Sequence, residues 1–251
     1  TINRYGIKCT FNLMASRVES GNGLTKEYIR SEILGKGHEL ATHGENHRGL
    51  DAARSIEGIQ DVLNCRLYFE KEFGGIIRGM AFPDRTVNKK LFPIAYERIK
   101  SFLQELDIAY ARTTGGDNDS FELPDDFHNW VPTAHHINPK LMDYIDKFLN
   151  MNVNGLYISQ RTPRLFYLWG HAFEFENNKN WDLLEAICEK LSGKDDIYYA
   201  TNIELYDYIT AYRSLIYSAD GKTIYNPTLK TLWFDRDGTL CKLESGETKR
   251  F

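Results

Sequence analysis

The feature that most constrains the fold of this chain is a regular alternation of short apolar segments with longer amphipathic ones. Short apolar runs between turn residues are typical of buried strands, and apolar residues spaced three and four apart indicate helices. Strands that alternate with helices form parallel sheets with crossover helices. The expected strands span residues 7–13, 40–43, 79–82, 108–111, 165–170 and 197–200. The expected helices span residues 25–36, 55–73, 88–106, 138–150 and 180–191, and a last helix runs to about residue 217.

Local signals mark the ends of some of these helices. Thr25 is suited to cap the first helix, and Gly37 is suited to end it. Asn138 followed by Pro139 predicts another helix start, with the proline at the first helical position. Residues 113–137 carry no clear periodicity. We interpret them as a long loop, and long loops in compact domains are usually functional.

The pattern changes after about residue 217, where short strand-like segments are joined by turns. The strands expected there span residues 223–225, 229–234 and 239–243. Asp237 and Gly238 form the dipeptide that favours a tight hairpin turn. We therefore expect an α/β barrel or wound sheet over residues 1–217 and a small β-strand appendage over residues 218–251.

Composition narrows the class of protein. The 251 residues are 42% hydrophobic and 26% charged, which is typical of a globular chain. The net charge of −4 gives no reason to expect nucleic acid as a partner. No apolar run reaches the ~18–20 residues that a membrane span needs, and no signal peptide is visible. Compartment and oligomeric state are not indicated.

The four cysteines are scattered, and no C-x-x-C pair is present. A structural zinc knuckle is therefore not expected. Reduced thiols suit this spacing, and two disulfides stay open as an alternative.

The strongest chemical signal is the segment GHELATHGENH, residues 37–47. His43 and His47 are four residues apart directly after a predicted strand, so a helical turn would bring both rings to one cation. Ligands of α/β folds bind at the carboxyl ends of strands. Gly44 stands where metalloproteases of the H-E-x-x-H type need glutamate, which excludes that class. The alternative is a pair of solvent-facing histidines on a turn.

Two further segments bring histidines to predicted strand ends or loops. LFYLWGHAFEFE places His171 at the end of a strand beside Trp169, where an imidazole can donate a proton to a leaving group. WVPTAHH places His135 and His136 in the long loop, where they line a site or lie on the surface. A structural role is the alternative for each of these histidines.

The segment WFDRDGTL matches the D-x-D-G-T opening of haloacid-dehalogenase-type phosphatases, with Asp235 as the nucleophile. In that fold the motif comes early and the other catalytic residues follow it. Here only 11 residues follow Leu240. A hairpin with an Asp-Gly turn therefore explains the segment better than a phosphatase does.

Taken together, the segments resemble the polysaccharide deacetylase family, which comprises metal-dependent carbohydrate esterases with a distorted (β/α) barrel. YGIKCTFNL resembles the second strand of the family, and GHELATHGENH resembles its H-[ST]-x-x-H metal motif. FGGIIRGMAFPDRT resembles the groove motif around R-x-P-[YF], and LFYLWGH resembles the late motif with the general acid. The resemblance extends over residues 1 to about 215.

The resemblance implies an α/β fold of the distorted barrel type and a role for several residues. His43 and His47 would bind a divalent transition metal, with zinc as the expected ion. His171 would be the general acid, and Phe82 and Pro83 would line the substrate groove. The implied reaction is hydrolysis of acetyl groups from a polysaccharide or oligosaccharide, with metal-assisted attack of water on the acetyl carbonyl.

The implied substrate is a carbohydrate, so aromatic and polar residues near the site are candidate contacts. Trp169, Trp130 and Tyr110 are expected to stack on sugar rings. His135 and Arg112 are expected beside the substrate.

The chain also departs from the family pattern. Ala81 stands where many members have the groove arginine, which Arg78, Arg85 or Arg112 would replace, and Gly44 replaces the usual Ser or Thr. The T-F-D-D motif, with the base aspartate and third metal ligand, lies upstream of the position of Ile7 in the family.

No residue of this sequence is singled out as a replacement for those aspartates. The candidate carboxylates are Asp51, Asp84, Asp117 and Asp119. The alternative function is therefore a non-catalytic or truncated deacetylase-like protein that binds glycans.

Overall fold

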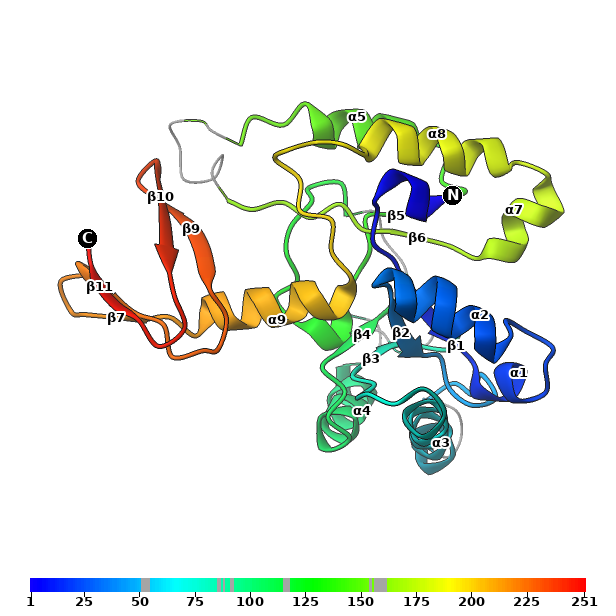
Figure 1. The fold of residues 1–251 in the computed structure, drawn as a ribbon. Helices are drawn as coiled ribbons and strands as arrows, with labels where there is room; N and C mark the ends of the chain where they lie inside the picture. The colour runs from blue at the N-terminus through cyan, green and yellow to red at the C-terminus, as the bar shows by residue number, and fades with distance from the viewer. Residues whose placement is uncertain are drawn as a thin grey trace. The chain divides into compact units, whose positions relative to one another are not determined.

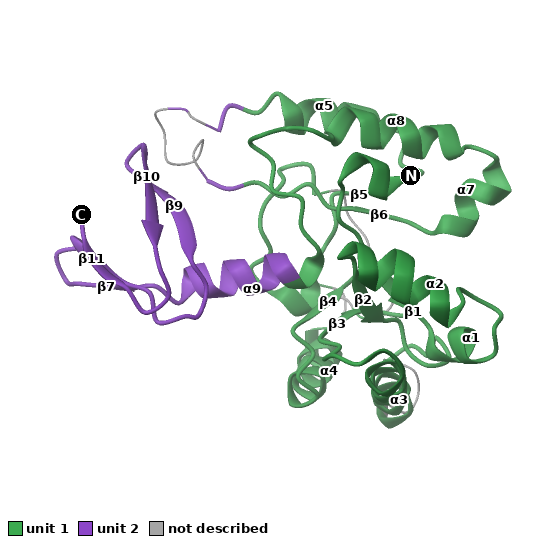
Figure 2. Cartoon of the chain, in the orientation of Figure 1, with its two compact units in different colours: residues 1–151, 164–203 green, residues 152–163, 204–251 purple. Residues whose placement is uncertain are grey.

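A computed structural model describes residues 1–50, 55–84, 87, 89–90, 93–114, 118–153, 155 and 162–251. These residues form two compact units, shown in separate colours in Figure 2. Unit 1 comprises Thr1–Met151 and Arg164–Ile203, and unit 2 comprises Asn152–Pro163 and Glu204–Phe251. The units therefore divide one helix earlier than the domain boundary expected at residue 217, and that boundary stays a prediction.

Unit 1 is built on a parallel sheet whose strands follow one another in the order of the chain (Figure 1). The strands are β1 (Thr10–Leu13), β2 (Glu39–Thr42), β3 (Gly79–Ala81) and β4 (Tyr110–Arg112). All three neighbouring pairs are parallel, as the alternation of strands and helices predicts. The carboxyl ends of these strands therefore meet at one edge of the sheet, and His43 directly follows β2 there.

Parallel hydrogen bonding continues beyond β4 through the segment that was expected to be a loop. The amide of Trp130 donates to the carbonyl of Ala111 (3.2 Å), and the amide of Thr113 donates to the carbonyl of Trp130 (3.0 Å). Strand β5 (Ala134–His135) then pairs in parallel with β6 (Leu168–Trp169). Within the described residues these strands form separate sheets rather than a closed barrel.

The helices mostly follow the predicted pattern (Figure 1). The α-helices of unit 1 are α1 (Ala15–Glu19), α2 (Lys26–Tyr28), α3 (Ser55–Phe73), α4 (Pro93–Glu105), α5 (Leu141–Leu149), α7 (Ala172–Asn178) and α8 (Trp181–Leu191). The shorter turns are η1 (Ile2–Tyr5), the π-helical η2 (Ile29–Ile33), η3 (Leu34–Lys36) and η4 (Phe127–Asn129). Helix α9 (Asn202–Arg213) begins in unit 1 and continues in unit 2. Helices α1 and α7 were not predicted.

The ends of the helices show where the local signals were right. The hydroxyl of Thr25 accepts a hydrogen bond from the amide of Tyr28 (3.2 Å), and Gly37 closes the same helical run with φ 73°. The start predicted at Asn138 was wrong, because α5 begins at Leu141. The Asn138 side chain instead accepts from the amide of Lys140 (2.9 Å) and caps the preceding turn.

The strand predicted over residues 197–200 is absent, and this segment is irregular. The hydroxyl of Tyr199 donates to the carbonyl of Leu191 (2.6 Å) and accepts from the amide of Lys194 (3.0 Å). The Tyr199 side chain therefore attaches this segment to the end of α8, and among the described residues no backbone hydrogen bonds pair it with a neighbouring strand.

The amino-terminal end of the sheet is held together by the carboxylate of Glu39. It accepts hydrogen bonds from the hydroxyls of Tyr110 (2.7 Å) and Thr10 (2.8 Å) and from the amide of Ile203 (2.9 Å). Burial raises the pKa of Tyr110 well above its ordinary value, so the phenol stays a donor. A Cβ on Gly79 would lie 2.2 Å from the Tyr110 hydroxyl, so this position needs glycine.

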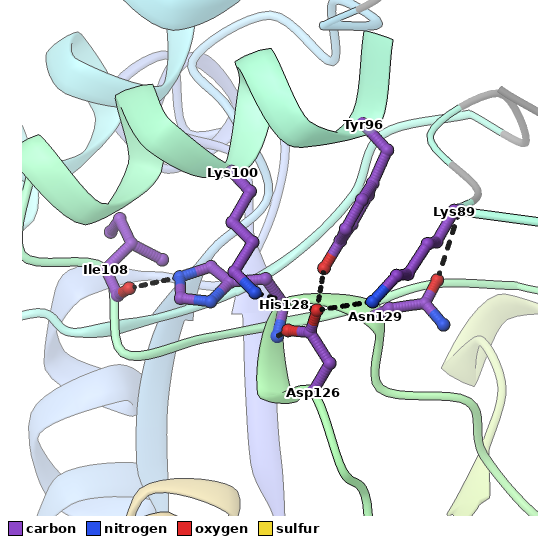
Figure 3. Close-up of polar contacts among 7 residues, drawn as sticks. All are labelled: Lys89, Tyr96, Lys100, Ile108, Asp126, His128 and Asn129. Atoms are coloured by element: carbon purple, nitrogen blue, oxygen red, sulfur yellow. Dashed lines mark hydrogen bonds and ion pairs between the residues drawn. The ribbon is translucent and has the colours of Figure 1, made fainter. Parts of the chain in front are cut away.

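A partly buried carboxylate fixes η4 under α4 (Figure 3). The Asp126 carboxylate accepts from the Tyr96 hydroxyl (2.8 Å) and the Lys100 ammonium (2.8 Å). His128 donates through Nε2 to the carbonyl of Ile108 (2.7 Å). Burial lowers the pKa of His128, so the ring is neutral in the folded chain. His128 therefore has a structural role.

Unit 2 consists of most of α9 and short antiparallel strands. The strands are β7 (Ile216–Tyr217), β8 (Thr223–Tyr225), β9 (Leu232–Arg236), β10 (Thr239–Leu243) and β11 (Thr248–Arg250). Asp237 (φ 52°) and Gly238 (φ 83°) join β9 to β10 in the predicted hairpin. Asp235 accepts from the amide of Gly238 (3.1 Å), which supports a turn rather than a phosphatase site.

All four cysteines are free thiols, so the disulfide alternative was wrong. Across the described ranges, no helix is both long enough and apolar enough to span a bilayer.

Candidate metal centre and neighbouring histidines

Two imidazoles meet at the carboxyl edge of the parallel sheet. The rings of His43 and His47 have centroids 4.7 Å apart and planes at 79°. The helical turn expected between them was wrong, because the segment after β2 is a loop. Gly44 (φ 78°) and His47 (φ 60°) both adopt left-handed backbone conformations there. These two residues turn the loop back so that the second ring faces the first.

One hydrogen bond selects the tautomer of His43. Its Nδ1 lies 2.9 Å from the carbonyl oxygen of Ala81 in β3, and because a carbonyl only accepts, Nδ1 carries the proton. In the neutral ring Nε2 then has a free lone pair for a metal. Burial lowers the pKa of His43 to about 4, although the hydrogen bond to Ala81 acts to raise it. The charges of His47, Arg112 and His171 lower this pKa further.

The loop that carries the second histidine is clamped by Asp61 of α3. Its carboxylate is 3% exposed and accepts from the amides of Asn46 (2.8 Å) and Arg48 (3.2 Å). The carbonyl of Asp61 accepts from the amide of Glu45 (2.9 Å). A Cβ on Gly44 would lie 2.2 Å from Oδ2 of Asp61, so this chain cannot carry the Ser or Thr of the resembled motif there. The sequence interpretation missed Asp61.

One of the four candidate carboxylates lies beside the histidines. Oδ1 of Asp84 is 4.0 Å from Nδ1 of His47, and Asp84 has a left-handed backbone (φ 61°). Asp119 forms an exposed ion pair with a lysine of α5 instead. Asp51 and Asp117 lie outside the described residues. Two imidazoles with a neighbouring carboxylate are donors that zinc accepts, so this residue set fits the expected ion.

Arg112 reaches the same edge from the end of β4. Its guanidinium is buried and lies over the ring of Trp169, with 4.2 Å between the guanidinium carbon and the ring centroid. Its Nη1 has no hydrogen-bond partner among the described residues. Of the other arginines considered as replacements, Arg78 precedes β3 at the opposite end of the sheet, and Arg85 lies outside the described residues.

A cluster of three histidines around one carboxylate lies next to Trp169. His171 is the N-cap of α7, and both its amide (3.1 Å) and Nδ1 (3.0 Å) are bonded to Oε2 of Glu174. Nε2 of His135 lies 3.3 Å from the same oxygen, and Nε2 of His136 lies 3.6 Å from it. Sequence interpretation included these histidines but missed Glu174.

Charges and burial set the protonation of this cluster. Burial lowers the pKa of His135 to about 4, although Glu174 opposes the shift. Burial acts to raise the pKa of Glu174, but hydrogen bonds from His171 outweigh it and hold the pKa below its ordinary value. The cluster therefore contains an ionised carboxylate and at least one neutral imidazole at neutral pH.

Several predicted substrate contacts are buried. Tyr110 is 0% exposed and Trp130 is 1% exposed, so the idea that these rings stack on sugars was wrong. Phe82 packs in the core beside α4, and Pro83 is also buried. Trp169 is half-buried and keeps part of its ring accessible.

Comparison with known proteins gives a family match for the first part of the chain. Residues 1–98, which include both His43 and His47, match the family model described as polysaccharide deacetylase. This match to the polysaccharide deacetylase family covers less than half of the 251-residue chain. No curated protein matches it in sequence.

Solved structures share the fold at low sequence identity. The Xyl-CE4 domain of a multidomain xylanase from the hindgut metagenome of Trinervitermes trinervoides is 18% identical, with a TM-score of 0.50 over 84% of this chain and 82% of that one. Puue allantoinase is 14% identical, with a TM-score of 0.56 over 82% of this chain and 68% of that one. The Streptococcus pyogenes deacetylase PplD is 19% identical, with a TM-score of 0.41 over 46% of this chain and 48% of that one. At these identities the likeness of the first two concerns the fold.

Proposed function

We propose that this chain is a metal-dependent hydrolase that removes acetyl groups from a carbohydrate. The observation that carries the proposal is the convergence of His43 and His47 at the carboxyl end of β2, with rings 4.7 Å apart. The hydrogen bond from Nδ1 of His43 to Ala81 leaves Nε2 free as a ligand atom. The match of residues 1–98 to the polysaccharide deacetylase family model supports an acyl-ester or amide substrate on a sugar.

In this proposal His43 and His47 hold the ion, zinc being the expected one, and the Asp84 carboxylate lies 4.0 Å from His47. When bound, zinc supplies Lewis-acid chemistry, which polarises a carbonyl oxygen and increases the acidity of water. His171 and Glu174 then have separate roles, in proton donation and in positioning. His171 holds a proton for the departing amine or alkoxide, and its bond to Glu174 keeps the ring in one orientation.

Arg112 is the proposed substitute for the groove arginine. Its buried Nη1 has an unused proton, which a carbonyl or hydroxyl oxygen of the substrate can accept. The partly accessible ring of Trp169 beneath it suits stacking on a sugar, and His135 lies beside that ring with centroids 4.4 Å apart. Phe82 and Pro83 support this groove from the core rather than touching the substrate.

The test is the substitution His47→Ala, because this side chain is partly exposed and its removal leaves no cavity in the core. Metal content and acetate release from an acetylated oligosaccharide are measured in the same preparation. The matched control is Asn46→Ala, whose exposed side chain lies in the same loop while its amide keeps the bond to Asp61.

We expect His47→Ala to lose the metal and to lower acetate release at least ~100-fold, with the control unchanged. Full activity in His47→Ala contradicts the proposal. Glycan binding that persists without metal, with no acetate released by the parent chain, favours the non-catalytic alternative. Ala81 is consistent with that alternative, because it stands in place of the groove arginine and its side chain is fully buried.

A further inference from the structure

A second group of metal-type donors lies outside the residues proposed to hold the first ion. The group consists of one nitrogen each from His135 and His136 and an oxygen of Glu174, all within 4.8 Å of one another. The two histidines come from the end of β5 and the residue after it, and Glu174 comes from the first turn of α7. Two different elements thus aim donors at one point.

His136 has no hydrogen bond that explains its burial. The residue is 2% exposed, and neither ring nitrogen has a hydrogen-bond partner among the described residues. A buried polar atom without a hydrogen-bond partner destabilises the fold, so buried histidines are normally bonded. The ring is also fixed in place, because it stacks on Phe175 (4.1 Å, 24°) and on His135 (4.6 Å, 30°).

Gly170 shows how closely the chain packs around this imidazole. A Cβ at Gly170 would lie 1.8 Å from Nδ1 of His136. The backbone before α7 therefore reaches the ring only because residue 170 has no side chain. This close packing holds the His136 ring in one position, and a ligand that is held in place favours metal binding.

We propose that His135, His136 and Glu174 form a second binding site for a divalent first-row transition metal. Two imidazoles and one carboxylate are donors that zinc, cobalt, nickel and ferrous iron accept, and they leave positions open for water or another ligand. The ion gives a ring nitrogen of the buried His136 a bonding partner in place of the missing hydrogen bond. The site shares no ligand with His43 and His47, so it does not rest on the proposed deacetylase function.

Occupancy of this site has a consequence for His171. Oε2 of Glu174 is the atom that bonds Nδ1 of His171 (3.0 Å) and also the atom nearest to His135 and His136. An ion bound there competes for that oxygen. The second metal would therefore alter the orientation of the histidine that we propose as proton donor.

The experiment uses the full chain, stripped of metal with a chelator and titrated with Co²⁺ alone. Visible absorption follows the ligand field, and elemental analysis after gel filtration counts the ions that remain bound. The parent is His47→Ala, so that the first proposed site is disabled. In this parent we expect about one cobalt ion per chain, and adding Glu174→Gln should remove it.

The control is Glu176→Gln in the same parent, because Glu176 lies on the same helix and accepts a hydrogen bond from Trp181 (2.8 Å) that glutamine can also accept. It should leave the cobalt bound. Gly170→Ala changes no ligand but displaces His136, and it should weaken cobalt binding at least ~10-fold. Thermal unfolding checks that each variant is folded.

Cobalt binding in the His47→Ala parent that survives Glu174→Gln overturns the second site, as does a parent that binds none. If the wild type and His47→Ala bind the same number of ions and Glu174→Gln removes one, the second site stands and the first proposal fails. The two proposals can therefore fail separately.

Discussion

Substituting Asp61 by asparagine tests whether a buried carboxylate fixes the shape of the loop that carries His47. The two oxygens of Asp61 accept separate amides, those of Asn46 (2.8 Å) and Arg48 (3.2 Å), which flank His47. A carboxamide has one acceptor oxygen and one NH₂ group that only donates. Asp61→Asn therefore keeps the volume of the side chain but leaves one of the two amides facing another donor.

The magnitude follows from two opposing terms. A hydrogen bond to a charged acceptor contributes about 1.5–3 kcal/mol, and the left-handed backbone of His47 (φ 60°) costs about 1–2 kcal/mol. The free energy lost with one of these hydrogen bonds is thus about as large as the free energy that the left-handed conformation of His47 costs. Because each 1.4 kcal/mol is tenfold in an equilibrium constant, zinc affinity should fall by about 10- to 100-fold.

The assay is a competition titration of zinc with a chelating dye, together with hydrogen exchange of the amides of Asn46 and Arg48. Exchange should accelerate at these two amides whether or not metal is present. The control is Asp119→Asn, which removes an exposed ion pair with Lys147 and should change neither quantity. Unchanged zinc affinity and unchanged exchange in Asp61→Asn would refute the reasoning.

Three further predictions concern other positions. Gly79→Ala should destabilise the fold by about 1–3 kcal/mol in urea unfolding, because its Cβ meets the buried Tyr110; equal midpoints contradict this. Burial lowers the pKa of His128 in the folded state, so its contribution is complete above about pH 6.5 and is lost as the pH falls through the folded value. His128→Asn should therefore reduce the loss of stability between about pH 7.5 and about pH 5.5, measured by urea unfolding. Arg112→Gln should lower kcat/KM for acetylated oligosaccharides ~10-fold or more while metal content is unchanged.

The parallel sheet was predictable because its strands are short apolar runs separated by amphipathic helices. Helix α3 (Ser55–Phe73) was predicted with its observed ends, and the β9–β10 hairpin followed from its Asp-Gly turn. The strand expected at residues 197–200 was wrong, since apolarity does not reveal that the Tyr199 hydroxyl attaches the segment to α8. Helix α7 was missed because seven residues give too few periods for a helical pattern.

The site was predictable only where residue type and spacing carry the chemistry. The His43–His47 spacing predicted a metal site, but the spacing does not encode the left-handed backbone conformations of Gly44 and His47. Asp61 and Glu174 act through distant backbone amides and through histidines of another strand, so their roles depend on tertiary structure. The one usable signal for Asp61 was an acidic residue beside Val62 on the apolar side of a helix.

The position of the Glu39 carboxylate separates the residues that stabilise the sheet from the loops that can be substituted. It binds Tyr110, Thr10 and the amide of Ile203 where the strands begin, whereas the loops with the histidines follow where the strands end. Substitutions in those loops therefore leave the Glu39 bonds intact. A directed-evolution library for new acyl substrates should randomise the loops after β2, β5 and β6 and leave Glu39 and its partners unchanged.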